Sequence, residues 1–341
     1  MALLELDHLT LRFGGLTAVN DVSVRIDAGQ IFAIIGPNGA GKTSMFNAIT
    51  GLYSPTSGQV LVDGRPVQQP PTIGDWLRWA RASVLTGAGV TLAVNVNSWW
   101  DATINHFAAR YPFPWGEAWS AAITTATSNQ GWTLIPALIG AVVGAAAGWN
   151  AWRMGRRTPD MVARAGVART FQNIRLFRDL SVLDNVLVGM DRHLTARGWD
   201  AALRLPRHRR EELAARNVAL DELAFVGLAT AAHQPAGSLP YGHQRRLEIA
   251  RALATRPKIL LLDEPAAGMN PTEATQLMTL IKRIRDRGIT VVLIEHHMRV
   301  VMGISDRIAV LHYGNKIAEG TPAEIRANPQ VIEAYLGKEE E

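Results

Sequence analysis

The sequence predicts an α/β fold built around a largely parallel sheet. The prediction depends on three apolar runs, rich in β-branched residues, at residues 258–264, 289–296 and 307–314. Near-continuous apolar runs are typical of strands that are buried on both faces of a parallel sheet, and helical patterns separate these three. Nearer the N-terminus, an apolar run at residues 31–35 leads into a glycine-rich loop and a further helical pattern. Strands and helices are therefore expected to alternate along much of the chain.

Turn and cap signals give the ends of several other elements. Residues 22–26 and 58–67 are expected to be strands, because β-branched residues are frequent in them and Gly or Asp residues bound them. Near the C-terminus, Thr321, Pro322 and Glu324 have the spacing of a helix start. The threonine is the cap, the proline takes the first helical position, and the glutamate lies three residues after the cap.

Composition excludes several classes of protein. Of the 341 residues, 48% are hydrophobic and 19% charged, which provides a large core and excludes extended disorder. The chain has no cysteine, so disulfides, thiolate metal sites and cysteine nucleophiles are excluded. The net charge of +5 is not gathered into a basic stripe, and no nucleic-acid partner is expected. Glu5 and Asp7 interrupt the first apolar run, which therefore does not resemble a signal peptide.

The composition divides the chain into three zones, residues 1–66, 67–158 and 159–341. The middle zone holds only nine charged residues but nine of the ten tryptophans in the chain. The α/β pattern of the first zone resumes in the third. We therefore expect one domain formed by the first and third zones, interrupted by the middle zone as an insert.

Residues 36–44, GPNGAGKTS, match the spacing of a P-loop between a strand and a helix. The glycines let backbone N–H groups curl around phosphates, and the helix N-terminus adds its positive dipole end. Lys42 is expected to reach the terminal phosphates of ATP, and the Thr43 hydroxyl to bind Mg²⁺. The candidate nucleotide-binding residues of this loop are Gly36, Asn38, Gly39, Gly41, Lys42, Thr43 and Ser44.

The run that ends in Asp263 and Glu264 supplies the second half of a phosphate-hydrolysing site. Asp263 stands at the end of an expected central strand, where its carboxylate would hold Mg²⁺ directly or through water. Glu264 follows at once and is placed to polarise the attacking water. ATP and Mg²⁺ are therefore the expected ligands.

Further motifs stand around this pair in a fixed order. Residues 238–253, SLPYGHQRRLEIARAL, precede the Asp263–Glu264 pair, and residues 266–270, AAGMN, follow it. An earlier segment, TFQ, ends in Gln172, and a later one, LIEHH, contains His296. Together with the P-loop, these motifs resemble the ATPase subunits of ATP-binding-cassette (ABC) transporters. The resemblance covers residues 3–66 and 159–337. It implies a P-loop NTPase core with an antiparallel β subdomain and a helical signature subdomain.

Longer segments, such as GVARTFQNIRLFRDLSVLDNVLVG at residues 166–189, resemble the branched-chain amino-acid importer subfamily, which also contains urea and short-amide importers. The resemblance implies an ATP-hydrolysing subunit at the cytoplasmic face of the cell membrane. Its expected partners are a second ABC ATPase subunit, two membrane permeases and a periplasmic substrate-binding protein. The alternatives are an ATPase of a urea or amide importer, one of a lipopolysaccharide exporter, and a non-transport ABC clamp protein.

The same resemblance implies roles for individual residues. Phe13 would stack on adenine, its alternative being an ordinary core phenylalanine. Gln172 would sense the γ-phosphate and Mg²⁺, and His296 would contact the γ-phosphate and orient the water. His297, where the family more often has aspartate, is expected to be only a neighbour.

The signature sequence departs from the usual Leu-Ser-Gly-Gly-Gln of the family. Pro240 replaces the serine that would donate to the γ-phosphate bound by an opposing subunit. Tyr241, Gly242 and His243 are still expected to face that nucleotide, with backbone N–H groups at the start of the following helix. His243, in place of glutamine, is the residue least like the family and is expected to tune closure of the two subunits.

The insert contains two stretches without charge, residues 82–100 and 120–152. From Trp79 to Trp99 there are about 20 residues, which at ~1.5 Å rise span roughly 30 Å, the thickness of bilayer hydrocarbon. We expect a helical hairpin that contacts the membrane through residues 79–152, the alternative being a soluble or interfacial helical subdomain. Gly140, Gly144 and Gly148 would share one helix face. Tryptophans stand at the ends of the apolar runs, at positions Trp79, Trp99, Trp100, Trp132, Trp149 and Trp152.

Overall fold

The computed structural model describes residues 2–67, 72–128, 130–155, 159–190 and 206–336. The chain divides into two compact units, each held together by contacts among its own residues. The first unit, Met1–Val67 with Thr158–Glu341, is called the ATPase unit below, and the second, Gln68–Arg157, is called the insert. The basic residues Arg156 and Arg157, which follow the second charge-free stretch in the sequence, lie outside the described residues.

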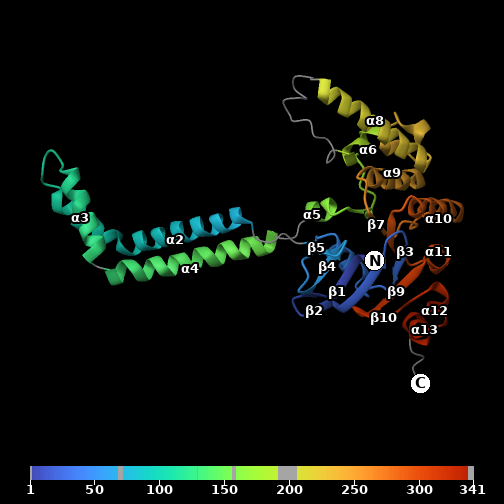
Figure 1. Ribbon diagram of the computed structural model, residues 1–341, viewed down its shortest axis with the longest axis horizontal. Coiled ribbons are helices and arrows are strands. Elements are labelled where there is room, and N and C mark those ends of the chain that lie inside the picture. The colour runs from blue at the N-terminus through green and yellow to red at the C-terminus, as the bar shows by residue number, and fades with distance from the viewer. Residues whose placement is uncertain (1, 68–71, 129, 156–158, 191–205, 337–341) are drawn as a thin grey trace. The chain divides into compact units, whose positions relative to one another are not determined.

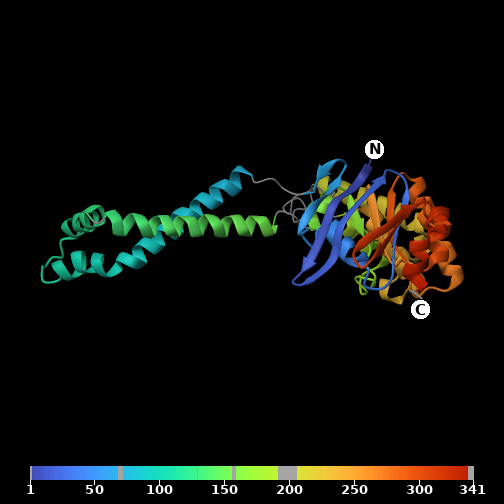
Figure 2. The ribbon, with the colours of Figure 1, turned by 90° about the horizontal axis from the view of Figure 1, so that it is seen from below.

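The main sheet of the ATPase unit has six strands in the order β10-β9-β3-β8-β7-β6 (Figures 1 and 2). Strand β3 pairs in parallel with β8 and β9, β7 pairs in parallel with β8 and β6, and only β10 is antiparallel, at one edge. This arrangement confirms the predicted α/β class. The strands are β3 (Ile31–Ile35), β6 (Val167–Arg169), β7 (Ile259–Asp263), β8 (Thr290–Ile294), β9 (Arg307–His312) and β10 (Asn315–Gly320).

A smaller antiparallel sheet, in the order β2-β1-β4-β5, completes the strands of this unit. It confirms the antiparallel β subdomain that the family resemblance implied. Helix α1 shares a core with this sheet and with one face of the main sheet, through residues such as Phe32, Met45 and Phe46. The elements are β1 (Ala2–Phe13), β2 (Leu16–Asp27), β4 (Ser57–Val62), β5 (Arg65–Pro66) and α1 (Lys42–Ile49).

The two faces of the main sheet enter different cores because side chains alternate along a strand. Ile31, Ala33 and Ile35 of β3 pack towards the helices that follow β6, whereas Phe32 and Ile34 pack towards α1. Helices α6, α8 and α9 pack on one another (Figure 1) and form the helical subdomain. These helices are α6 (Val182–Met190), α8 (Pro206–Val226) and α9 (Tyr241–Ala254).

Helix starts in the last third of the chain follow local sequence. Thr321 accepts a hydrogen bond from the Glu324 N–H, and the Glu324 carboxylate accepts one from the Thr321 N–H, which confirms the predicted start of α12. Asn270 and Glu273 make the same reciprocal cap at α10. The remaining helices are α5 (Pro159–Arg164), η3 (Ala229–Ala231), η4 (Ala236–Ser238), α10 (Pro271–Asp286), α11 (Met298–Ile304), α12 (Pro322–Ala327) and α13 (Pro329–Leu336).

The insert is helical. Its two long helices, α2 and α4, lie side by side and antiparallel in both views (Figures 1 and 2). The second charge-free stretch, residues 120–152, is divided between α3 and α4. The elements are α2 (Ile73–Trp100), the π-helix η1 (Asp101–Asn105), α3 (Trp115–Ser128) and α4 (Gln130–Gly155).

Hydropathy singles out one of these helices. Among the described residues, only Leu134–Trp152 of α4 has both the length and the mean hydropathy, 1.6, of a membrane span. Helix α2 is long enough but does not reach that hydropathy, because Ser, Thr, Asn and Gly residues interrupt its apolar positions. Hydropathy therefore supports one span and does not support the expected hairpin of two.

Candidate active site

The P-loop connects β3 to α1 and depends on its glycines. Gly36, Gly39 and Gly41 all have positive φ angles, which L-residues with side chains rarely adopt. A Cβ on Gly36 would lie 2.1 Å from the Leu311 carbonyl oxygen, and one on Gly41 would lie 2.2 Å from the Ala18 carbonyl oxygen. These neighbours are backbone atoms and leave no room for a side chain. The loop is therefore held against β9 and β2 in a curled form that only glycine permits.

Lys42, the first residue of α1, lies folded into this loop. Its ammonium donates to the carbonyl oxygens of Gly36 at 2.7 Å and Pro37 at 2.8 Å. Burial lowers the pKa of Lys42, and the charges of Glu264 and Asp263 act in the opposite direction. The carbonyls thus hold the ammonium in a place from which it could transfer to a phosphate. The other predicted loop residues, Asn38, Gly39, Thr43 and Ser44, lie exposed or half-buried around it.

Asp263 ends strand β7 and is almost fully buried. Its Oδ2 forms an ion pair with Arg169 Nη2 at 2.6 Å. Its other oxygen, Oδ1, is buried without a hydrogen-bond donor. A buried carboxylate oxygen without a donor fits a cation ligand, since leaving it unpaired would otherwise cost free energy. Together with the exposed Thr43, this oxygen is suited to Mg²⁺.

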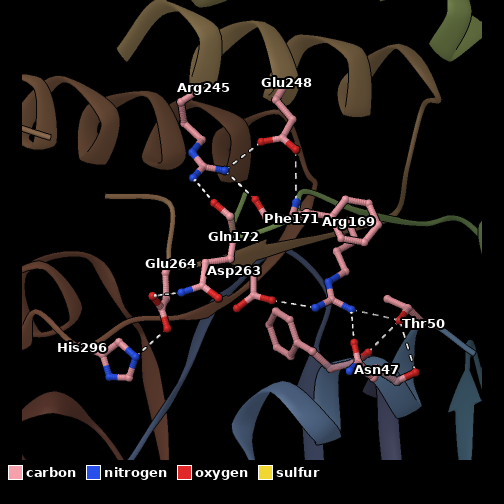
Figure 3. A network of polar contacts seen from close by, with 11 residues as sticks. Asn47, Thr50, Arg169, Phe171, Gln172, Arg245, Glu248, Asp263, Glu264 and His296 are labelled. Atoms are coloured by element: carbon pink, nitrogen blue, oxygen red, sulfur yellow. Dashed lines mark hydrogen bonds and ion pairs between the residues drawn. The ribbon is translucent and has the colours of Figure 1, made fainter. Parts of the chain in front are cut away.

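Arg169, on the neighbouring strand β6, had no role in the expected site. Besides Asp263, it donates from Nη1 to Asn47 Oδ1 at 2.6 Å and to Thr50 Oγ1 at 3.3 Å (Figure 3). It also lies over the ring of Phe171, 5.3 Å from its centroid. These contacts fix the guanidinium and, through it, the Asp263 carboxylate. The only sequence signal was an arginine within a short apolar strand.

Arg169→Met should therefore weaken the magnesium-dependent reaction. Asp263 would lose the cation that orients it, and disturbing groups that hold a metal ligand typically costs about 10–100-fold in affinity or activity. We expect a higher Mg²⁺ concentration for half-maximal ATP hydrolysis, measured by titration of the ion at saturating ATP. Arg164→Met is the matched control, because Arg164 is exposed and 4.0 Å from its carboxylate partner. Equal titration curves for the two variants would exclude this role of Arg169.

Glu264 lies between the two other residues expected around the γ-phosphate (Figure 3). His296 Nε2 is 2.6 Å from its Oε1, and Gln172 donates from Nε2 to its Oε2 at 2.9 Å. Glu264 itself has a φ angle of +47°, which is uncommon for a residue with a side chain. The structure thus brings together three residues that are far apart in the sequence. A carboxylate beside the γ-phosphate position, with the His296 ring and the Gln172 amide against its two oxygens, is suited to general-base chemistry.

A buried ion pair fastens the backbone at Gln172 to the signature helix α9. Arg245, fully buried, donates to the carbonyl oxygens of Phe171 at 2.6 Å and Gln172 at 2.7 Å, and to Glu248 at 2.8 Å. Glu248 in turn accepts a hydrogen bond from the Phe171 N–H at 3.2 Å. We call these two residues the Arg245–Glu248 clamp. Both lay inside the quoted signature motif, but they were not expected to belong to the site.

The signature residues begin α9. Pro240 is its N-cap residue, Tyr241 and His243 are exposed on the first turn, and Gly242 is buried. A Cβ on Gly242 would lie 2.9 Å from a carboxylate oxygen of Glu273, so the helix start lies close against α10. Among the described residues, no hydrogen bond links these side chains to Lys42 or Glu264.

Two aromatic residues lie outside the polar network. Phe13, the expected adenine platform, is 43% exposed and makes an edge-to-face contact with Tyr53, 5.0 Å between ring centroids. It is therefore not a core phenylalanine. Tyr335 of α13 bonds with the Gly36 backbone, and burial raises the pKa of Tyr335 to about 12. Only Phe13 was predicted from the sequence.

Comparisons with known proteins agree with this geometry. A family model described as ABC transporter matches residues 19–95 and 148–267. A second, described as branched-chain amino acid ATP-binding cassette transporter, matches residues 315–341. The high-affinity branched-chain amino acid transport ATP-binding protein BraF of Pseudomonas aeruginosa is 37% identical over 337 residues, 98% of each chain. The protein of the same description, LivG, from Escherichia coli (strain K12) is 36% identical over 337 residues, again 98% of each.

Solved structures show the same fold. A nucleotide-free ATP-binding cassette from an ABC transporter has a TM-score of 0.64 at 23% identity and covers 99% of this chain and 100% of its own. The ADP conformation of an ATP-binding cassette has a TM-score of 0.65 at 22% identity, with the same coverage. Fold and site together define a P-loop ATPase. The chain belongs to the family of ABC transporter ATP-binding subunits, within its branched-chain amino-acid branch.

Proposed function

We propose that this ATPase hydrolyses Mg²⁺-bound ATP to drive the import of branched-chain amino acids. The observation that carries the catalytic part is Glu264 held between Gln172 and His296. The substrate class is supported by relatives whose names describe high-affinity branched-chain amino acid transport. The C-terminal family match, at residues 315–341, supports the same branch.

The proposed roles follow from the geometry. Lys42 would exchange its two carbonyl partners for the terminal phosphates, while Glu264 accepts the proton of the attacking water. His296 and Gln172 would orient that water and the Glu264 carboxylate. Asp263 and Thr43 would hold Mg²⁺, which when bound neutralises phosphate charge. Phe13, exposed beside Tyr53, would stack on adenine.

The second wall of the site is proposed to come from another ATPase subunit. Tyr241, Gly242 and His243 stand at a helix start and are not bonded to Lys42 or Glu264 of their own chain in the described residues. The exposed Tyr241 and His243, with the backbone N–H groups at this helix start, would face the γ-phosphate of a partner, which would make two ATP sites from two subunits. Closure on ATP and opening after hydrolysis would then move two permeases at the cytoplasmic face of the membrane.

Co-purification tests the transport role. The tagged chain, expressed from its native locus, should bring down two permease proteins and a second ATPase, and a periplasmic binding protein should stimulate the complex when it carries leucine. Stimulation by urea or a short amide in place of leucine would move the chain to that kind of importer. Recovery of the chain without any permease would favour the non-transport clamp.

His243 provides a test of the signature surface. His243→Gln restores the usual family residue at an exposed position, so we expect ATP hydrolysis by the assembled complex to be preserved or raised. His233→Gln makes the same chemical change at another exposed histidine and serves as the control. A large loss for His243→Gln alone would show that His243 has a function of its own. The measurement is steady-state phosphate release at saturating ATP.

A further inference from the structure

We propose that α2 and α4 of the insert cross a lipid bilayer together, as a pair of spans, with residues 101–117 beyond the far surface. The inference does not require the chain to import amino acids. The exposed faces of α2 and α4 are proposed to contact the hydrocarbon core of a membrane. Contact with a permease surface, or with a second copy of the chain in solution, would be a different result of the experiments below. Hydropathy alone identifies only α4, so the case for α2 depends on chain topology and helix packing.

The chain path requires an even number of crossings. The insert leaves the ATPase unit after Val67 and returns to it at Thr158. Both ends of the insert must therefore lie on the same side of any membrane. If Leu134–Trp152 of α4 spans, a second helix must span in the opposite direction. Helix α2 has 28 residues, lies antiparallel to α4, and is the other described helix of the insert long enough to do so.

The charges and tryptophans are placed as at two membrane surfaces. Residues 82–100 and 118–152 contain no charged residue. At one end, Trp79 contacts the rings of Trp149 and Trp152, with centroids 5.5 and 5.7 Å away. At the other end, Trp100, Trp115 and Trp119 are exposed near an Arg110–Glu117 ion pair. About 20 residues of helix separate the two ends, roughly 30 Å at ~1.5 Å per residue.

The helices meet along small residues, as membrane helices do. A Cβ on Gly140 would lie 2.6 Å from the Thr86 carbonyl oxygen, and one on Gly144 would lie 2.6 Å from the Ala82 carbonyl oxygen. The third glycine of the row, Gly148, faces the Trp79 ring. The predicted face of three glycines is therefore the contact surface of the pair. A close contact between backbones needs no apolar side chain and can form where lipid provides no hydrophobic driving force.

Four of the polar side chains that lower the hydropathy of α2 have hydrogen-bond partners inside the pair. Thr86 donates to the Gly140 carbonyl oxygen of α4 at 2.7 Å. Ser83 and Thr91 donate to carbonyl oxygens four residues earlier, at 2.8 and 2.9 Å, and the buried Asn95 donates to Thr91 at 3.0 Å. Side-chain polar groups with internal partners avoid most of the cost of entering hydrocarbon. The hydropathy of α2 thus understates its fitness for a bilayer.

The outer faces of the pair are apolar. On α2, Val84 and Leu85 are 70% and 69% exposed, and on α4, Leu138 and Val142 are 65% and 68% exposed. Large exposed apolar surfaces mark contact with a membrane or a partner. A soluble partner would be expected to meet some charge at the rim of such a surface, and residues 82–100 and 118–152 carry none. Hydrocarbon is the environment that matches a face without charge over this length.

Charge also sets the orientation. Arg78 and Arg81 precede the first charge-free stretch, and Arg153 follows the second. The connection between α2 and α4 contains one arginine, Arg110, and no lysine. Basic residues favour the cytoplasmic side. The end that joins the ATPase unit is therefore cytoplasmic, and residues 101–117 are on the opposite side.

Because the chain has no cysteine, single cysteines can be introduced and labelled to determine on which side of the membrane each segment lies. Single cysteines are placed at Ala108 beyond α2, at Val84 within it, and at Glu222 in the ATPase unit, and each full-length variant is labelled in membrane vesicles with an impermeant maleimide. We expect Ala108→Cys to react in right-side-out vesicles and Glu222→Cys only in inverted ones. Val84→Cys should react in neither until detergent is added. Reaction of Ala108→Cys and Glu222→Cys on the same side, or release of the chain by carbonate, would overturn the proposal.

Two glycine variants test whether the helices cross as a pair. Gly144→Leu places a side chain where Thr86 Oγ1 and the Ala82 carbonyl oxygen already lie, whereas Gly89→Leu points into open space. Both changes raise hydropathy equally. We expect Gly144→Leu to make the insert sensitive to added protease or carbonate and Gly89→Leu to behave as the parent. Equal behaviour of the two would contradict the pairing of α2 with α4, whatever the ATPase activity of the complex.

Discussion

Glu264→Gln is expected to keep ATP binding and to lower ATP turnover by about 10²–10⁴-fold, the contribution typical of general-base catalysis. The amide preserves the shape of the side chain and leaves an oxygen for His296 or Gln172, but it no longer accepts a proton from water. Single-turnover hydrolysis and equilibrium nucleotide binding, measured on the assembled transporter, separate the two effects. Trapped ATP should also hold the two ATPase subunits closed.

The control for this variant is Glu222→Gln. Glu222 is on α8, where it pairs with Arg287 at 2.9 Å, outside the group of residues around Glu264. The same chemical change there should leave turnover within a factor of two of the parent, because Glu222 contacts Arg287 and none of the residues bonded to Glu264. Parental turnover by Glu264→Gln would show that another group takes the proton.

Arg245→Met is expected to destabilise the ATPase unit by about 3–5 kcal/mol, the usual result of removing one partner of a buried ion pair. Glu248 would remain as a buried anion, and the carbonyl oxygens of Phe171 and Gln172 would lose their donor. The midpoint of urea unfolding of the full chain, followed by far-ultraviolet circular dichroism, measures the loss. Arg285→Met removes a partly exposed arginine with carboxylate partners and should shift the midpoint much less.

A double variant distinguishes the clamp from simple loss of packing. Arg245→Met with Glu248→Met replaces both charges by apolar side chains, which is often nearly neutral for a buried pair. We expect the double variant to be more stable than Arg245→Met alone, although the Gln172 loop would still lack its anchor. If the two single effects simply added, the clamp would not be a coupled pair.

The parts of the site that the sequence predicted are those encoded locally. Gly36 to Thr43 have the P-loop spacing, and the strand that ends in Asp263 places Glu264 next to it. The meeting of Gln172 with His296 at Glu264 could be expected only from motif order, because 92 residues separate Gln172 from Glu264 in the chain. The family resemblance supplied that order.

The clamp and Arg169 could not be predicted in the same way. Arg245 bonds to backbone atoms 73 and 74 residues away, and Arg169 meets Asp263 across 94 residues. Their identity as buried arginines depends on tertiary packing, and an arginine in a helix or strand is more often exposed.

For the insert, the sequence pattern was clear but its average hydropathy was misleading. Its charge-free length was visible, but average hydropathy did not reveal that Thr86 and Asn95 find partners within the helix pair.

The central claim, that ATP hydrolysis at Glu264 powers amino-acid import, is tested most directly by transport in proteoliposomes. The complete complex is reconstituted with its periplasmic binding protein, and uptake of labelled leucine is followed with ATP supplied on the side of the ATPase subunits. We predict uptake that requires ATP and Mg²⁺ and that disappears in Glu264→Gln while binding of leucine to the binding protein persists. Leucine uptake at the parental rate by Glu264→Gln would contradict the account.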